Sequence, residues 1–356
     1  MSLPNHGANP HHVYKKLGLT PPARVIDFSE NVNPLGPPDS VQLAWNDFQK
    51  LMRLYPDPVG EPFRTNVAKY HNVSPETIFV ANGAAEIFSL LAERYKGKRA
   101  ILVHPTFSEY EATLKVRQVE IVNVFMKNII TCELPIEDMK KQMQRADVLY
   151  LCTPNNPTGS LPKRSVIMDL IEYARISNCE MVLDEAFIDF ISEEASFISN
   201  QLAPHVIVVR SMTKMYAMPG LRLGYMVATP SIIHEVQQLA PHWNVNGIAA
   251  EVGSLVLKDE AYRQKTIQHS VDMRLDMSAF LINHGCEVTQ SQVNFLLFKL
   301  PHPNKEFFRH FLRKGIVLRH TENFHGLDGQ WYRIGMKSEE EMEILKKELK
   351  AWFEGL

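Results

Sequence analysis

The sequence predicts an α/β fold in which a mostly parallel sheet is flanked by helices. Short apolar runs alternate with amphipathic segments through the middle of the chain, a pattern typical of strands joined by crossover helices. Polar motifs follow directly after several of the apolar runs. Because ligands bind beyond the carboxyl ends of strands in open α/β sheets, the motifs predict one site at one edge of the sheet.

Short, mainly apolar runs that end at a turn or a polar residue predict the strands. They cover residues 78–81, 99–103, 147–152, 181–183 and 206–209. A helix is expected over residues 84–96, where Ile87, Leu90 and Leu91 recur on one face, and another through Val166 to Ala174.

The pattern changes from about residue 248 and predicts a smaller α+β domain. One long helical segment is expected over residues 248–281, followed by a strand over 293–298 and a helix over 307–314. Ser338 and Glu341 have the spacing of a capping box that opens a last helix.

The first 40 residues are rich in proline, asparagine and glycine, and we expect them to be irregular. We also expect them to pack beside the C-terminal part, near the site. The predicted organisation is a large domain over residues 41–247 and a small domain formed by residues 1–40 and 248–356.

Composition and charge argue against several classes of protein. Lys and Arg (38) balance Asp and Glu (40), so neither nucleic acid nor a membrane is an expected partner. Residues 1–9 lack the apolar stretch of a signal peptide, and no apolar run reaches the roughly 18 residues of a membrane span. We therefore expect a cytoplasmic protein. Its four cysteines show neither close pairing nor ligand spacing, so we expect reduced thiols and no metal site.

The most informative motif is Ser211-Met212-Thr213-Lys214, which is followed by Arg222 in a glycine-framed turn. A lysine amine can bond covalently to an aldehyde cofactor, and hydroxyls with an arginine suit a phosphate. The S-x-T-K pattern alone is weak, because most lysines are solvated. Its weight comes from two upstream motifs, Asn155-Asn156-Pro157-Thr158-Gly159 and Asp184-Glu185-Ala186.

Together with Arg333-Ile334-Gly335, these motifs resemble fold-type I pyridoxal 5'-phosphate (PLP) enzymes of the aminotransferase class I and II group, over nearly the whole chain. The resemblance implies that Lys214 bonds to the PLP aldehyde and later moves protons. It implies that Asp184 pairs with the pyridine nitrogen and that Asn156 donates to the ring oxygen. The structural alternatives are a solvated lysine, a capping aspartate and a turn asparagine.

The resemblance also implies a cup for the cofactor phosphate at a helix N-terminus, formed by Gly83, Ala84, Ala85, Ser211, Thr213 and Arg222. Phe107 matches the aromatic residue that stacks on the ring. Tyr55 matches a tyrosine that reaches the phosphate in the neighbouring subunit, which implies a homodimer with shared active sites. The alternatives are a core phenylalanine and a loop aromatic. Phe187 stands where many relatives have tyrosine, so one donor to the ring oxygen is missing.

The flanking segments narrow the reaction. His6-Gly7-Ala8-Asn9, residues 27–38 and residues 323–327 resemble L-threonine O-3-phosphate decarboxylases of cobalamin biosynthesis, although those enzymes typically have Gly-Gly after the leading histidine. The resemblance implies that Arg333 binds the α-carboxylate of this phosphorylated amino acid. The substrate phosphate is expected to bind Arg319, with His6 and Asn33.

The expected reaction is decarboxylation to (R)-1-amino-2-propanol O-phosphate. Histidinol-phosphate aminotransferases share most of the core motifs, so transamination with 2-oxoglutarate is the main alternative. A PLP-fold binding protein or regulator without turnover is a third possibility. It is disfavoured because regulators of this kind usually carry an N-terminal basic DNA-binding module, and no basic cluster occurs near the N-terminus.

Overall fold

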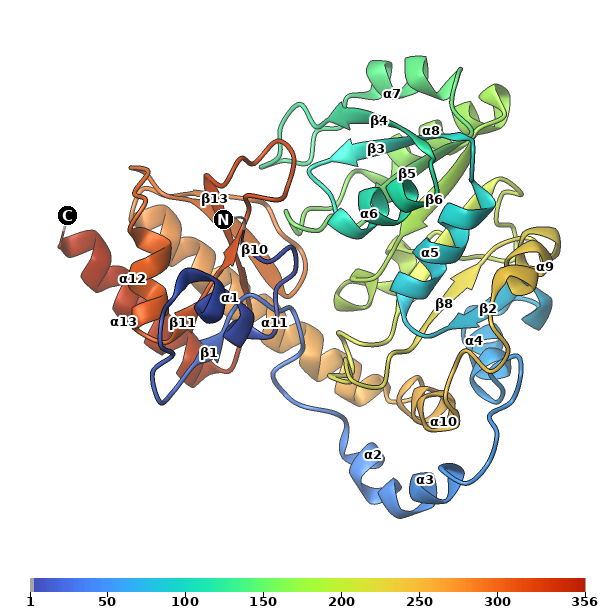
Figure 1. Ribbon diagram of the computed structural model, residues 1–356, viewed down its shortest axis with the longest axis horizontal. Coiled ribbons are helices and arrows are strands. Elements are labelled where there is room, and N and C mark those ends of the chain that lie inside the picture. Colours follow the sequence, from blue (N-terminus) through green and yellow to red (C-terminus); the bar gives the residue numbers. More distant parts are fainter. Residues whose placement is uncertain (1–2, 356) are drawn as a thin grey trace.

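The computed structural model describes residues 3–355 and is built around a seven-stranded sheet (Figure 1). The strand order is β2-β8-β7-β6-β5-β3-β4. Neighbours from β7 to β4 pair in parallel, whereas β8 pairs antiparallel with both β7 and β2. The prediction of a mostly parallel sheet is therefore confirmed. The strands are β2 (Ile78–Ala81), β3 (Arg99–His104), β4 (Glu120–Phe125), β5 (Val148–Cys152), β6 (Glu180–Asp184), β7 (Val206–Ser211) and β8 (Gly224–Val227).

Alternate strand residues enter two different cores, because successive side chains of a strand point to opposite faces. Ala100 and Leu102 of β3 pack with α5 (Ala84–Arg94), α6 (Ser108–Val116) and α9 (Pro230–Leu239). Ile101 and Val103 pack with α7 (Ile136–Met143) and α8 (Arg164–Ser177). Helices thus cover both faces of the sheet. A further cluster joins α4 (Phe63–His71) and α10 (Gly247–Val256) to the edge formed by β2 and β8.

A second layered unit combines the two ends of the chain. Its four-stranded sheet has the order β12-β13-β10-β9, and β1 pairs with β11 in a separate parallel ribbon. In Figure 1 the blue N-terminal elements lie against the orange and red C-terminal ones. The elements are α1 (Pro10–Leu17), β1 (Ile26–Asp27), α11 (Glu260–Asn283), β9 (Glu287–Val288), β10 (Phe295–Lys299), α12 (Phe307–Arg313), β11 (Ile316–Val317), β12 (Arg319–His320), β13 (Trp331–Gly335) and α13 (Glu339–Glu354).

One apolar core is shared by these terminal elements and includes Val13, Phe28, Leu296, Phe311 and Leu345. The expectation that the N-terminal segment packs beside the C-terminal part is confirmed. The domain boundaries at residues 40 and 248 stay a prediction. Across residues 3–355, no helix combines the length and the apolar character needed to span a membrane.

Two predictions about elements were wrong in part. The single helix expected over residues 248–281 is two helices, α10 and α11, and the Asp259 carboxylate caps the second by accepting from Tyr262 N at 3.0 Å. Asp259 is a residue type favoured at helix N-caps, and the expectation of one continuous helix overlooked that signal. The N-terminal 40 residues, expected to be irregular, contain α1, which has Pro10 in its first turn and ends at Gly18 with φ 64°.

The remaining helices link or extend these units. Short helices α2 (Asp39–Leu43) and α3 (Trp45–Leu51) lie at the lower edge of Figure 1, away from the main body of the sheet. Single 3₁₀ turns occur at η1 (Pro75–Thr77), η2 (Ile188–Phe190) and η3 (Glu193–Ala195). The capping box predicted at Ser338 and Glu341 is present at the start of α13.

Candidate active site

A cavity of about 560 Å³ lies where the carboxyl ends of the large sheet meet the second unit. Its walls combine residues that are far apart in the sequence, from the N-terminal segment to β13. The lining includes most of the predicted site residues, namely His6, Ala84, Ala85, Phe107, Asn156, Asp184, Ser211, Thr213, Lys214, Arg222, Arg319 and Arg333. The placement of polar motifs after strands therefore located one shared site.

Lys214 follows β7, and its amine donates to Thr213 Oγ1 at 2.9 Å. Burial, together with the nearby cations Arg222 and Arg333, lowers the pKa of this amine from its ordinary 10.5 to about 8, against the opposing charge of Asp184. A lowered pKa increases the neutral fraction of the amine, which is the form that attacks an aldehyde. The geometry suits a nucleophilic lysine rather than a solvated one.

Asp184 is the last residue of β6, and its carboxylate is buried at the wall of the cavity. Its Oδ1 accepts from Ala186 N at 2.9 Å, and its Oδ2 accepts from the Tyr110 hydroxyl. Burial raises the pKa of Asp184 to about 6, while these donors and Lys214 pull it down. An acid in this setting can pair with a protonated ring nitrogen.

The predicted phosphate cup is assembled by the antiparallel pair β7–β8, in which Ser211 lies opposite Gly224. The Ser211 and Thr213 hydroxyls lie 2.9 Å apart, and Arg222 precedes β8. Gly83, with φ 80°, caps α5, and a Cβ there would lie 2.5 Å from Arg222 Nη2. Only glycine lets the helix N-terminus and this guanidinium approach so closely, and the two together suit an anion.

Arg333 on β13 connects the two units across the cavity. Its Nη1 donates to Asn156 Oδ1 at 2.6 Å, and its Nη2 donates to Ser29 O at 2.7 Å. Burial and the neighbouring Arg319 lower the pKa of Arg333 to about 9. With its oxygen engaged by Arg333, the Asn156 amide keeps its NH₂ group available to donate into the cavity.

Arg319 on β12 holds the N-terminal segment against the site. Its Nη2 donates to Asn5 O and to Asn323 Oδ1, each at 2.6 Å, and its Nη1 donates to His320 O at 2.7 Å. Within residues 3–355 its hydrogen-bond acceptors are neutral oxygens, so its charge has no acidic partner at contact distance. Burial lowers its pKa to about 10, which leaves it cationic at neutral pH. His6 lines the same wall and lies 3.4 Å from Glu109 Oε2.

Three predicted residues do not line this cavity. Asn33 is buried elsewhere, and its Nδ2 donates to Met215 O, Tyr262 Oη and Thr266 Oγ1, all at 2.8 Å. Gly83 lies behind Arg222 rather than at the surface of the cup. Tyr55 is 83% exposed and packs on Trp243, with ring centroids 5.0 Å apart.

Sequence reasoning missed several lining residues of the N-terminal segment. Asn5, Ser29, Glu30 and Asn31 all face the cavity. The Glu30 carboxylate is paired with Lys337 Nζ at 2.7 Å, which offsets part of its charge. These residues lie in the stretch that was read as irregular. Their polar character near Asn33 was the available signal.

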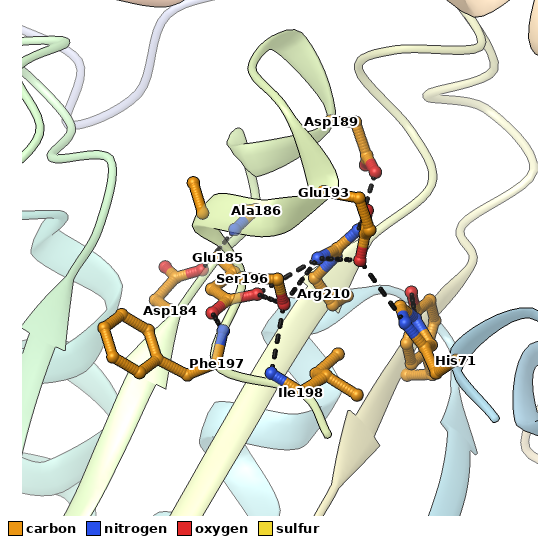
Figure 2. Close-up of polar contacts among 12 residues, drawn as sticks. His71, Asp184, Glu185, Ala186, Asp189, Glu193, Ser196, Phe197, Ile198 and Arg210 are labelled. Carbon is orange, nitrogen blue, oxygen red and sulfur yellow. Dashed lines mark hydrogen bonds and ion pairs between the residues drawn. The ribbon is translucent and has the colours of Figure 1, made fainter. Parts of the chain in front are cut away.

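Behind the site, a buried charge network holds the turn that follows Asp184 (Figure 2). Arg210 of β7 contacts Glu185 Oε2 at 3.0 Å, Asp189 Oδ1 at 2.8 Å and Glu193 Oε2 at 3.0 Å. Figure 2 shows these carboxylates converging on the guanidinium, with His71 beyond Glu193. Burial raises the pKa of Glu185, and the Arg210 charge counters that effect. The network explains why a glutamate follows Asp184.

Comparisons with known proteins agree with this architecture. The family model for aminotransferase class I and II matches residues 23–349. The chain is 33% identical over 358 residues to threonine-phosphate decarboxylase of Salmonella typhimurium, covering 99% of this chain and 97% of that protein.

Solved structures of both expected activities are similar to this chain. The histidinol-phosphate aminotransferase of Clostridium acetobutylicum has a TM-score of 0.87 at 26% identity, and the L-threonine-O-3-phosphate decarboxylase of Porphyromonas gingivalis has a TM-score of 0.78 at 27% identity. Each match covers 92% of this chain and 99% of the other.

Proposed function

The chain belongs to the aminotransferase class I and II family and is a PLP-dependent enzyme, and on this premise we propose that it decarboxylates L-threonine O-3-phosphate. The product would be (R)-1-amino-2-propanol O-phosphate, an intermediate of cobalamin biosynthesis, with release of CO₂. The identity to a threonine-phosphate decarboxylase over nearly the full length of both chains supports this choice.

The residues present fit PLP. Lys214 offers a buried amine with a lowered pKa, and Asp184 offers a buried carboxylate for the ring nitrogen. A Cβ at residue 83 would displace the Arg222 guanidinium, which is the cation of the phosphate cup. The NH₂ group of Asn156 can donate to the ring oxygen, and Phe107 can cover one ring face from the cavity wall.

The observation that carries the proposal is the arrangement of cations around the cavity. Arg222 belongs to the cofactor cup, which leaves Arg333 and Arg319 for the substrate. Two separate guanidinium groups match a substrate that has both a carboxylate and a phosphate. Arg319 supports the phosphate role because its present acceptors are neutral and His6 lies on the same wall.

The proposed chemistry assigns each side chain a task. Bound PLP supplies an electron-withdrawing ring that stabilises negative charge at the substrate Cα. Arg333 would grip the carboxylate, and Arg319 with His6 would anchor the phosphate, so that these residues would set the orientation of the Cα–carboxylate bond. Cleavage of that bond would release CO₂ and leave its electron pair with Cα. Lys214 or a water then delivers a proton to Cα.

Transamination of histidinol phosphate with 2-oxoglutarate is the second candidate. It is favoured by the TM-score of 0.87 to a histidinol-phosphate aminotransferase. The same cations could serve it, but on separate substrates, because histidinol phosphate carries the phosphate and 2-oxoglutarate carries the carboxylates. The two reactions differ in which bond at Cα is held perpendicular to the ring.

A paired assay separates the candidates. The PLP-loaded protein is incubated with L-threonine O-3-phosphate while CO₂ is measured, and in parallel with histidinol phosphate and 2-oxoglutarate while glutamate is measured. Sustained CO₂ release without glutamate is the expected result. Glutamate without CO₂ would replace the decarboxylase proposal with the aminotransferase.

The proposal includes a homodimer in which Tyr55 reaches the cofactor phosphate of the second copy. Support comes from the high exposure of Tyr55 and of Leu43, Met52 and Leu54 in the same segment, because solvated apolar side chains that cluster often mark an interface. Sedimentation should give twice the chain mass, and Tyr55→Ala should weaken PLP binding. A monomer that retains full PLP affinity would contradict the dimer.

A further inference from the structure

We propose that Tyr110 is a positioning residue whose hydroxyl holds the Asp184 carboxylate in the orientation that receives the ring nitrogen of PLP. The inference rests on the proposed role of Asp184 in cofactor binding, and it does not depend on which substrate the enzyme uses. Tyr110 does not line the cavity, so it would act through Asp184 rather than on the cofactor.

The contacts of Asp184 fix its carboxylate from behind. The Tyr110 hydroxyl donates to Oδ2, and Ala186 N donates to Oδ1 at 2.9 Å. The Cys152 thiol lies 3.9 Å from Oδ2, which makes it a weaker partner. Removing the Tyr110 hydroxyl would leave Oδ2 without its main donor, and the carboxyl group could then rotate about its terminal torsion, which is intrinsically broad.

The Tyr110 ring is itself held by aromatic contacts. It meets Phe88 edge-on with centroids 4.8 Å apart, and Tyr150 at 5.5 Å. It also meets Phe107 edge-on at 5.7 Å. Phe107 is the residue expected to stack on the cofactor, and it caps the helix that carries Tyr110. The N-terminal end of α6 therefore supports both Phe107, which is expected to stack on the ring, and Asp184, the expected partner of the ring nitrogen.

The Tyr110 hydroxyl also affects the protonation of Asp184. The titratable groups that face this carboxylate are Tyr110 from α6, Cys152 from β5 and Lys214 after β7. Burial raises the pKa of Asp184, and donation by Tyr110 opposes that rise. Burial also raises the pKa of Tyr110 well above its ordinary value, so the hydroxyl keeps its proton and remains a donor. Loss of the hydroxyl therefore favours a protonated Asp184, which is a poor partner for a protonated ring nitrogen.

The test is the pH dependence of PLP binding to the apoenzyme, followed by cofactor absorbance. PLP affinity should fall as the pH is lowered. In Tyr110→Phe the midpoint of this fall should lie about 1 pH unit higher than in the wild type, which corresponds to about a tenfold loss of affinity near pH 6. Tyr150→Phe is the matched control, because the Tyr150 hydroxyl is buried in the same aromatic cluster and has no partner within residues 3–355. It should reproduce the wild-type profile, and circular dichroism checks that both variants fold.

Asp184→Asn separates this inference from its premise. In that background Tyr110→Phe should cause no further shift, because the group that titrates is gone. Coincident profiles for Tyr110→Phe and the wild type, or an equal shift in Tyr150→Phe, would overturn the role of Tyr110. If Asp184→Asn alone binds PLP with the wild-type affinity and profile, the role of Asp184 fails first and takes this inference with it.

Discussion

Replacing Arg333 by lysine tests the carboxylate site most directly. The two ends of the guanidinium fork engage Asn156 Oδ1 at 2.6 Å and Ser29 O at 2.7 Å. A lysine carries its charge on a single nitrogen and cannot reproduce both contacts together with a bidentate hold on a carboxylate. Each charge-assisted hydrogen bond contributes about 1.5–3 kcal/mol, so losing one lowers kcat/KM by roughly 10- to 150-fold.

The structure implies the loss of one internal bond and one bond to substrate, so we expect a decrease in kcat/KM of at least about 100-fold. The assay is CO₂ release from L-threonine O-3-phosphate at limiting substrate. Cofactor absorbance should show that Arg333→Lys still binds PLP, because Lys214 and the phosphate cup are unchanged. Arg313→Lys is the control, since Arg313 is mostly solvated and pairs with Glu306 at 3.6 Å. An Arg333→Lys enzyme within about threefold of the wild type would refute the assignment.

Four further predictions concern other parts of the molecule. Arg319→Met should raise KM for the phosphorylated substrate at least about tenfold while leaving PLP content unchanged; an unaltered KM would remove Arg319 from the phosphate role. Arg210→Met should lower the free energy of unfolding, measured by denaturant titration, by about 3–5 kcal/mol, because the buried Glu185 carboxylate loses its cationic partner. The control Arg175→Met, on the surface, should change the free energy of unfolding by less than about 0.5 kcal/mol. PLP uptake by the apoenzyme should accelerate as pH rises and level off above about 8, the pKa of Lys214. Between about 8 and 10.5 the unfolded chain binds a proton that folded Lys214 lacks, so the contribution of this group to stability should increase with pH over that window.

The sequence was sufficient for the central strands because each is a short apolar run with a polar residue after it. It was insufficient for β4, whose residues are mostly exposed or half-buried at the sheet edge, and for β8, whose first residue is a glycine. The break between α10 and α11 was missed because α11 buries mainly polar residues over its first half, so no change of apolar face marks its start.

The candidate site was predictable where a residue ends or closely follows a strand of the large sheet, as Asp184 and Lys214 do. Tyr110 could not be assigned in this way, because its role depends on α6 passing close to the end of β6. Its position three residues after Phe107, on the same helical face, was the only signal available. Asn33 lies away from the cavity wall, because a polar residue near the site can equally well serve a buried junction, here with α11.

The cavity takes the residues proposed to bind the cofactor from the large sheet, and Arg319 and Arg333, which are proposed to bind the substrate, from the second sheet. The orientation of a bound substrate relative to the cofactor ring therefore depends on how the two sheets face each other. A small rotation between them would exchange the bond at Cα that stands perpendicular to the ring. Evolution could in this way convert one reaction into the other through substitutions at the junction between the sheets, with every residue of the cavity wall retained.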